Sequence, residues 1–321
     1  MRVSACTEVG AGNIRRSSLC GGALLAFGFL TCGPAFALDG ANPNAPEKIP
    51  LKTFSSAQQA LRAGLDDLKA GDAASSVAAL TYAAEGGQTI ARWKLGEMYA
   101  DGVGVPRDDV KAYHYFNQLV EDYDEDQPDR RNLGVISNAF VEVGLYSLNG
   151  IPNSDVRPDP ERAHELFQYA ATTFGDPNAQ YHLARMYIVG TGGLAKDSVV
   201  AVRWLALAAA KGHRPSQAQL GHMLFNGDGV PHQRARGLMW LEIAREGAQD
   251  PKDKWIRELC QQDLAAATDE DRQTAAALVE TRAKGSTFAA KGLVKSLSVV
   301  RPADAPGEPV ESPPPSTAAA Q

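Results

Sequence analysis

The stretch ARWKLGEMYADGVGVP, residues 91–106, decides the fold. Its apolar residues Ala91, Leu95 and Met98 recur three or four positions apart, which predicts an α-helix with one apolar face. The GVGVP run then ends that helix, because glycine adopts positive φ readily and proline cannot continue a helix. The glycine that follows Leu95 leaves room for a partner helix to approach closely. The stretch therefore predicts the first helix of a helical hairpin.

The same pattern occurs four times along the chain. In each copy a large apolar residue is followed directly by a small residue, and a glycine lies six positions after that small residue. The four large residues are Leu95, Val143, Leu183 and Leu220. Successive copies are therefore offset by 48, 40 and 37 residues (95 to 143, 143 to 183, 183 to 220). Each copy continues into a helical stretch in which a large residue is followed by small ones. A single hairpin of this size cannot bury both of its apolar faces, so neighbouring hairpins must stack. The predicted fold class is all-α, a solenoid of stacked helical hairpins.

The segments on either side of the repeats predict how the array begins and ends. Residues 57–70 and 73–85 form a degenerate helical pair that caps the N-terminal end. Thr268 and Asp271 form a capping box that opens the second of two closing helices. The predicted parts are a signal peptide (1–37), a linker (38–54), the repeat solenoid (55–248), C-terminal capping helices (249–285) and a disordered Pro/Ala-rich tail (286–321).

The first residues have the composition of a secretory signal peptide. Arg15 and Arg16 precede an apolar run at 19–30, and a PAFA sequence ends at Ala37, the predicted cleavage site. The apolar run is shorter than the about 20 residues that span a bilayer. The mature chain is therefore expected to be exported and not to span the membrane. A buried N-terminal helix and a lipoprotein anchor at Cys32 are the alternatives.

Charge and residue spacing exclude several classes of function. The chain has 321 residues and a net charge of −6, which argues against nucleic-acid binding because phosphates require clustered Lys and Arg. The six histidines have no His-x-x-x-His spacing, and the Gly-x-Gly pairs follow no predicted strand. Cys260, alone in the mature chain, is expected to be a buried apolar residue. The predictions are no enzyme activity, no metal and no cofactor.

The repeated pattern resembles a known repeat family. Its form is Ala-x-x-x-Leu-Gly-x-x-Tyr-x-x-Gly-x-Gly-Val followed by Lys-Ala-x-x-aromatic, and the best copies lie at 91–119 and 179–212. This pattern resembles the Sel1-like repeat, a relative of the tetratricopeptide repeat. The resemblance implies a right-handed superhelical solenoid that grips a partner with residues of the first helix of each hairpin. The candidate protein-binding residues are Arg92, Trp93, Lys94, Glu97, Tyr181, His182, Arg185, Gln219, His222 and Met223. Trp93 is favoured among them because Trp is enriched in binding hot spots, with packing between repeats as the alternative.

Three further segments carry a closer resemblance. The sequences YAAEGG at 82–87, GIPNSDVR at 150–157 and TFGDPNAQ at 173–180, together with Arg92-Trp93, are similar to those of the periplasmic negative regulators of exopolysaccharide production. The resemblance implies a periplasmic protein that binds the periplasmic domain of a membrane sensor histidine kinase. It also implies that the bound kinase is held off until a periplasmic protease cleaves the repressor. The alternative is a periplasmic scaffold that assembles envelope polysaccharide or peptidoglycan enzymes.

An acidic insertion lengthens the first good repeat. Its candidate regulatory residues are Glu121, Asp122, Tyr123, Asp124, Glu125 and Asp126, and a solvated loop of like charges is the alternative interpretation. Together with the six histidines, this insertion motivates the hypothesis that acid alters partner binding or the protection of the loop from protease.

Overall fold

The computed structural model describes residues 54–283. The predicted signal peptide, its cleavage site at Ala37 and the predicted tail lie outside the described residues, as does all of the predicted linker except Phe54. Within the described range the chain forms helices and turns and no β-strand. The α-helices are α1 (Ala57–Lys69), α2 (Ala73–Glu85), α3 (Thr89–Asp101), α4 (Asp109–Glu121), α5 (Leu133–Asn149), α6 (Pro160–Tyr169), α7 (Pro177–Val189), α8 (Ser198–Ala210), α9 (Arg214–Asn226), α10 (Arg234–Gly247), α11 (Lys254–Ala265) and α12 (Asp269–Ala283).

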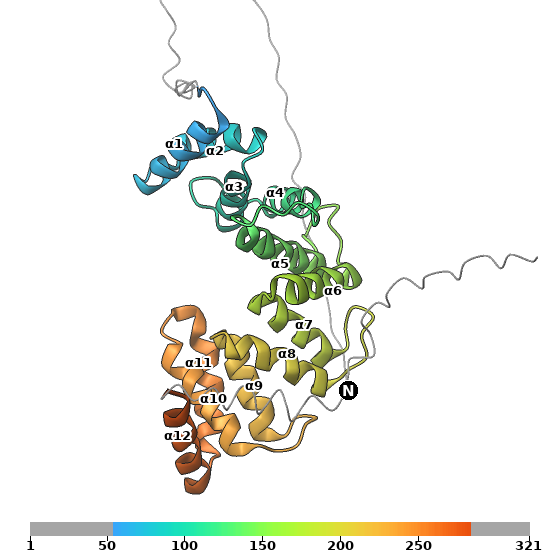
Figure 1. Ribbon diagram of the computed structural model, residues 1–321, viewed down its shortest axis with the longest axis vertical. Helices are drawn as coiled ribbons and strands as arrows, with labels where there is room; N and C mark the ends of the chain where they lie inside the picture. Colours follow the sequence, from blue (N-terminus) through green and yellow to red (C-terminus); the bar gives the residue numbers. More distant parts are fainter. Residues whose placement is uncertain (1–53, 284–321) are drawn as a thin grey trace, which may run out of the picture. The chain divides into compact units, whose positions relative to one another are not determined.

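Consecutive helices pair as hairpins, and the hairpins stack (Figure 1). α1 pairs with α2, α3 with α4, α5 with α6, α7 with α8, and α9 with α10, while the second helix of each hairpin contacts the first helix of the next. α11 packs on α9 and α10, and α12 packs on α10. The prediction of an all-α array of stacked helical hairpins is confirmed. Over the described residues, no helix combines the length and apolar character needed to cross a bilayer.

The small residue after each large apolar residue lets the two helices of a hairpin approach closely. A Cβ added at Gly96 would lie 2.4 Å from the Phe116 ring, and one at Gly144 would lie 2.6 Å from the Phe167 ring. In the third repeat the position holds Ala184, which is fully buried. The predicted role of these small residues is confirmed at Gly96 and Gly144, where the second helix places a large buried ring directly against the glycine.

Aspartates begin most of the second helices, and glycine ends the first helices. The Asp108 side chain accepts from the backbone N–H of Lys111 and caps α4, and Asp197 caps α8 in the same way. Gly102 ends α3 with a φ of 71°, a left-handed conformation that suits glycine. At the other end of the array, the Thr268 N–H donates to Asp271 Oδ2 and the Asp271 N–H donates to Thr268 Oγ1. This reciprocal pair is the capping box that the sequence predicts.

The hairpin of α5 and α6 has two features that the third and fourth repeats lack. A turn at 150–159 replaces the usual Gly-x-Gly run, with Ile151 buried and its N–H donating to the Val156 carbonyl at 2.8 Å. α6 continues into a π-helix, Ala170–Phe174, which ends at Gly175. Such a π-turn shifts the direction of the side chains that follow it. The hairpin of α5 and α6 therefore differs in geometry from the hairpins of the third and fourth repeats, and it lies beside the acidic insertion.

Candidate protein-binding surface

Arg92 connects the first good repeat to the preceding hairpin and to the acidic insertion. It lies on α3, its Nε donates to the Ala84 carbonyl at 3.3 Å, and its guanidinium pairs with the carboxylate of Asp122. Its side chain is 18% exposed and Asp122 is 63% exposed, so the guanidinium is mostly covered. The structure thus joins a candidate binding residue to Asp122 of the acidic insertion, a contact that the sequence does not predict.

The three other candidates on α3 differ in accessibility. The Trp93 ring packs against the Phe116 ring with centroids 4.9 Å apart and is partly buried, as the packing alternative expects. Lys94 and Glu97 form an ion pair at 2.6 Å with about a third of each side chain exposed. Such a partly exposed pair contributes little to stability, and both charged groups reach the surface of α3.

Glu142 is a residue of this surface that sequence analysis missed. It lies on α5, and burial together with the neighbouring carboxylates of Asp101 and Glu97 raises its pKa above the ordinary value of a glutamate. The three carboxylates come from two neighbouring first helices, α3 and α5, so only the stacking of the repeats brings them together. This group of carboxylates could not be predicted from the sequence, because no acidic residue lies close to Glu142 along the chain.

Replacing Glu142 with glutamine is expected to stabilise the protein at neutral pH. A raised pKa means that the ionised carboxylate is disfavoured in the folded state, so the ionised form lowers stability above that pKa. Glutamine removes this penalty and keeps the shape of the side chain. The melting temperature of Glu142→Gln should exceed that of the wild type at pH 7, and the difference should shrink as the pH falls below about 4.3, the ordinary glutamate pKa, because glutamate then becomes protonated in both states. A lower melting temperature at pH 7 would contradict the assignment.

In the third repeat Tyr181 lies between His213, which immediately precedes α9, and Arg185. The Tyr181 ring meets the His213 ring edge-on with centroids 5.3 Å apart, and the Arg185 guanidinium lies 5.9 Å from the Tyr181 centroid. His182 instead stacks on Phe167 of the preceding repeat, with centroids 5.2 Å apart. Arg185 is the exposed member of the group.

The buried environment of these histidines bears on the acid hypothesis. Burial is the main cause that lowers the pKa of His182 to about 4, and burial does the same to the pKa of His213. Both imidazoles are therefore neutral in the folded protein at mildly acidic pH. The expectation that acid charges the histidines near their ordinary pKa is wrong for these two, because desolvation disfavours the imidazolium.

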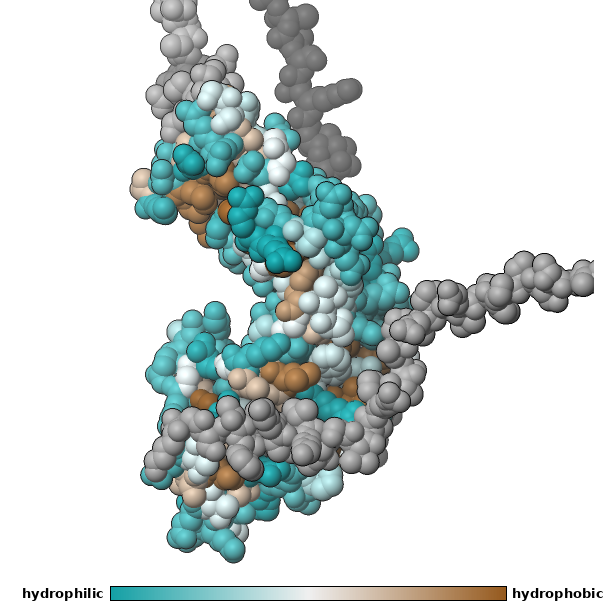
Figure 2. Space-filling view, in the orientation of Figure 1, coloured by the Kyte–Doolittle hydropathy of each residue, from teal (hydrophilic) through white to brown (hydrophobic). Residues whose placement is uncertain are grey.

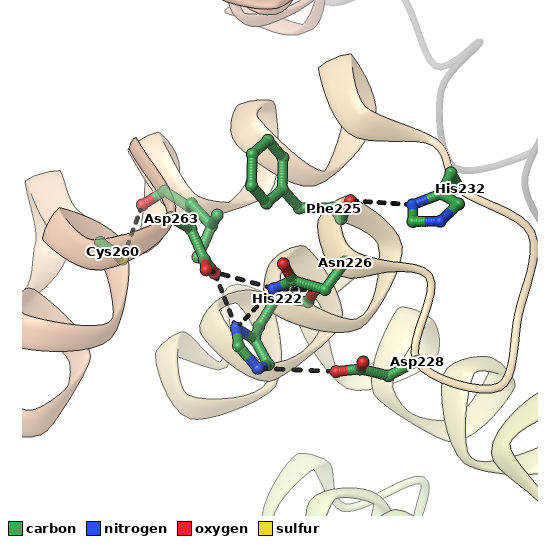
Figure 3. Close-up of polar contacts among 8 residues, drawn as sticks. His222, Phe225, Asn226, Asp228, His232, Cys260 and Asp263 are labelled. Carbon is green, nitrogen blue, oxygen red and sulfur yellow. Dashed lines mark hydrogen bonds and ion pairs between the residues drawn. The ribbon is translucent and has the colours of Figure 1, made fainter. Parts of the chain in front are cut away.

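In the fourth repeat, His222 is part of a polar network that joins α9 to α11 (Figure 3). Its Nδ1–H donates to Asp263 Oδ2 at 2.7 Å, and its Nε2 lies 3.5 Å from Asp228 Oδ2. Asn226 Nδ2 donates to the other oxygen of Asp263 at 3.2 Å. Asp263 is only 3% exposed, so this network gives a buried carboxylate its partners. His222 is engaged within the chain on both ring nitrogens, while Gln219 is half-buried.

The prediction that Met223 lies on the binding surface is wrong. Met223 is 2% exposed and packs in the core formed by α8, α9 and α10. Its position three residues after Leu220 matches that of Met98 after Leu95, and both methionines are buried. Met223 therefore belongs to the apolar face of its helix.

The pairing of His222 with Asp263 resembles part of a catalytic triad without its nucleophile. Within residues 54–283, His222 Nε2 faces the Asp228 carboxylate at 3.5 Å and not a hydroxyl or a thiol. Cys260 is buried, donates its thiol to the Leu241 carbonyl at 3.2 Å, and has a pKa raised to about 11 mainly by burial. A thiol in this state is not an activated nucleophile. The described part of the chain also contains no cluster of His, Cys, Asp and Glu that could hold a metal ion.

The acidic insertion is anchored at its start and exposed beyond it. Tyr123 inserts edge-on against Phe140, Tyr169 and Phe174, with centroids 5.5 to 6.3 Å apart. Asp122, Asp124, Glu125 and Asp126 are exposed, as the solvated-loop alternative expects, and Glu121 accepts from Asn117 Nδ2 at 2.6 Å. The insertion is therefore an acidic loop held in place by one aromatic side chain and by the pair of Asp122 with Arg92.

Comparison with known proteins agrees with this architecture. Residues 89–121, 141–172, 177–213 and 214–248 match the model of the Sel1 repeat. A Sel1 repeat protein from Oxalobacter formigenes, of known structure, superposes with a TM-score of 0.51 at 22% identity over 72% of this chain and 88% of that chain, which shows a shared fold.

Two sequence relatives cover most of the chain. An "Exopolysaccharide production negative regulator" of Rhizobium leguminosarum bv. viciae is 35% identical over 83% of this chain and 94% of its own length. A protein of the same description from Rhizobium meliloti (strain 1021) is 34% identical over 79% of this chain and 90% of its own length. The chain therefore belongs to the family of Sel1-repeat proteins that includes these exopolysaccharide production negative regulators.

Proposed function

We propose that this protein is a negative regulator of exopolysaccharide production that acts by binding another protein. The observation that carries the proposal is the identity of 34–35% with two regulators of that description, over nearly their whole length. The repeat array is of a kind that binds partners over an extended surface. This fold and the names of the relatives favour a role in regulation over one in catalysis.

The partner that we propose is the periplasmic domain of a membrane sensor histidine kinase. The leader-like composition of residues 1–37 supports export to the periplasm, where such a domain is accessible. A bound regulator can shift the kinase only through a difference in its affinity for the two kinase states. The protein is accordingly proposed to bind the inactive state more tightly and so to keep the pathway off. Cleavage by a periplasmic protease would then release the kinase.

Deletion of the gene is expected to raise exopolysaccharide output and kinase-dependent transcription, and the full-length chain should restore both. Affinity capture of the mature chain from the periplasm should return the kinase. Unchanged output in the deletion strain would contradict the regulatory role. Capture of polysaccharide or peptidoglycan synthases without a kinase would instead identify a scaffold.

A further inference from the structure

A groove with an apolar floor lies along α6. Its volume is about 570 Å³, and its floor consists of Phe140 from α5 and of Leu166 and Tyr169 from α6. The Phe140 and Tyr169 rings stack with centroids 4.9 Å apart and an interplanar angle of 21°. Tyr123 closes on both rings from the acidic insertion. Figure 2 shows hydrophobic (brown) surface next to hydrophilic (teal) surface in the region of α5 and α6.

The rim of this groove is acidic. Asp159, Glu161 and Glu165 line it and are exposed. The cation among its lining residues is Arg162, which donates from Nη2 to Asn117 Oδ1 at 2.9 Å and is thereby held toward α4. Three carboxylates against one guanidinium leave the rim negative. The charge of Glu125 also acts on Tyr169, so the acidic insertion adds to the negative potential over the floor.

We infer that this groove, formed by α5 and α6, binds a basic, amphipathic segment of a partner protein. An apolar side chain of that segment inserts against Phe140, Leu166 and Tyr169, while Lys or Arg side chains on either side of it pair with Asp159, Glu161 and Glu165. The inference goes beyond the proposed function because it names the surface and the chemistry of the partner, and it relies on the proposed function only for the partner's identity.

Charge complementarity favours this occupant over the others. A second copy that presented the same groove would bring one acidic rim against another, and like charges across an interface disfavour association. A nucleic acid would place phosphates against the same carboxylates. A basic segment gains from steering by the rim, and an apolar side chain of that segment is removed from water when it packs on the apolar floor.

The first test uses a probe of defined chemistry. A short fluorescein-labelled peptide in which Lys alternates with Leu is titrated with the full chain by fluorescence anisotropy, beside a peptide with Glu in place of Lys. The wild type should bind the Lys peptide and not the Glu peptide. Glu161→Lys/Glu165→Lys should weaken binding at least about tenfold, equivalent to about 1.4 kcal/mol. It should also flatten the loss of affinity with added salt.

Glu242→Lys/Glu246→Lys is the matched control, because these glutamates on α10 have the same spacing and the double change alters the net charge equally. It should bind the Lys peptide within about twofold of the wild type. Glu161→Gln/Glu165→Gln, which adds no cation at the start of α6, should give an intermediate loss. Equal weakening by the control would reveal a general charge effect and overturn the assignment. Unchanged binding by Glu161→Lys/Glu165→Lys would do the same.

The second test uses the kinase sensor domain as the ligand and the same set of variants. The same order of affinities is expected. A sensor domain that the wild type does not bind would contradict the proposed function, and the peptide titration would still decide whether the groove binds basic segments. A sensor domain that binds the wild type and Glu161→Lys/Glu165→Lys equally would contradict the groove and leave the proposed function in place.

Discussion

Gly221→Ala is expected to lower the melting temperature by several degrees. Gly221 lies where α9 approaches α10, and an added Cβ would lie 2.7 Å from Leu241 Cγ and 2.8 Å from the Gly237 carbonyl oxygen. The Leu241 backbone nitrogen would lie 3.0 Å away. Backbone atoms cannot rotate aside as the end of a side chain can, so the two helices must move apart. Overpacking of this kind costs about 1–3 kcal/mol, which exceeds the about 1 kcal/mol that alanine gains over glycine in helix propensity.

The chain offers a matched control in Gly134→Ala. Gly134 is also in a helix, in the first turn of α5, but an added Cβ would have nothing within 4 Å. Alanine there gains helix propensity without a clash, so the melting temperature should stay the same or rise. Thermal melts followed by circular dichroism compare the two variants directly. A Gly221→Ala protein that melts at or above the wild type would show that the hairpin does not depend on this close approach.

The repeat architecture could be predicted because its signals are local. Each copy places a large apolar residue, a small residue and a glycine turn within a few positions, and these positions face the partner helix. The burial of Met223 could be predicted from the same local signals. Met98, Met186 and Met223 each follow the large apolar residue of their repeat by three positions, and all three are buried. Comparison between copies would have assigned Met223 to the core.

The contacts of the candidate surface could not be predicted in the same way. Arg92 and Asp122 are 30 residues apart, and His222 and Asp263 are 41 apart, so each pair depends on how neighbouring elements stack. The composition of the acidic insertion predicts a solvated loop, and it gives no sign that Tyr123 inserts between rings from α5, α6 and the π-helix. Burial, which sets the pKa of His182, is likewise a property of the packed array.

Acid is expected to destabilise the protein between about pH 6.5 and pH 4 through His182 and His213. Both have a pKa lowered to about 4 in the folded protein, whereas an unfolded histidine has a pKa of about 6.5. Between these values the unfolded chain binds more protons than the folded one. Stability is therefore fully present above about pH 6.5 and falls as the pH decreases, by at most about 1.4 kcal/mol per pH unit for each histidine.

The contacts of His213 agree with a neutral ring. Its Nε2–H donates to Asn178 Oδ1 at 3.0 Å, which leaves Nδ1 to accept from the Ser216 hydroxyl at 2.8 Å. Protonation of Nδ1 would turn this acceptor into a donor and force the hydroxyl to reorient. Because Asn178 lies on α7 and Ser216 on α9, the charged ring would strain the junction between the third and fourth repeats.

His182→Phe separates the titration of His182 from its packing. Phenylalanine can keep the stacking on Phe167, where the histidine ring lies at 5.2 Å, and it cannot be protonated. Urea unfolding at pH 7 should give a free energy close to that of the wild type, and the loss between pH 6.5 and pH 4.5 should be smaller in the variant. Equal losses would exclude His182 as a source of acid sensitivity. The expected result assigns the His182 share of the effect of acid to the junction of the second and third repeats, where a neutral buried ring packs α7 against α6.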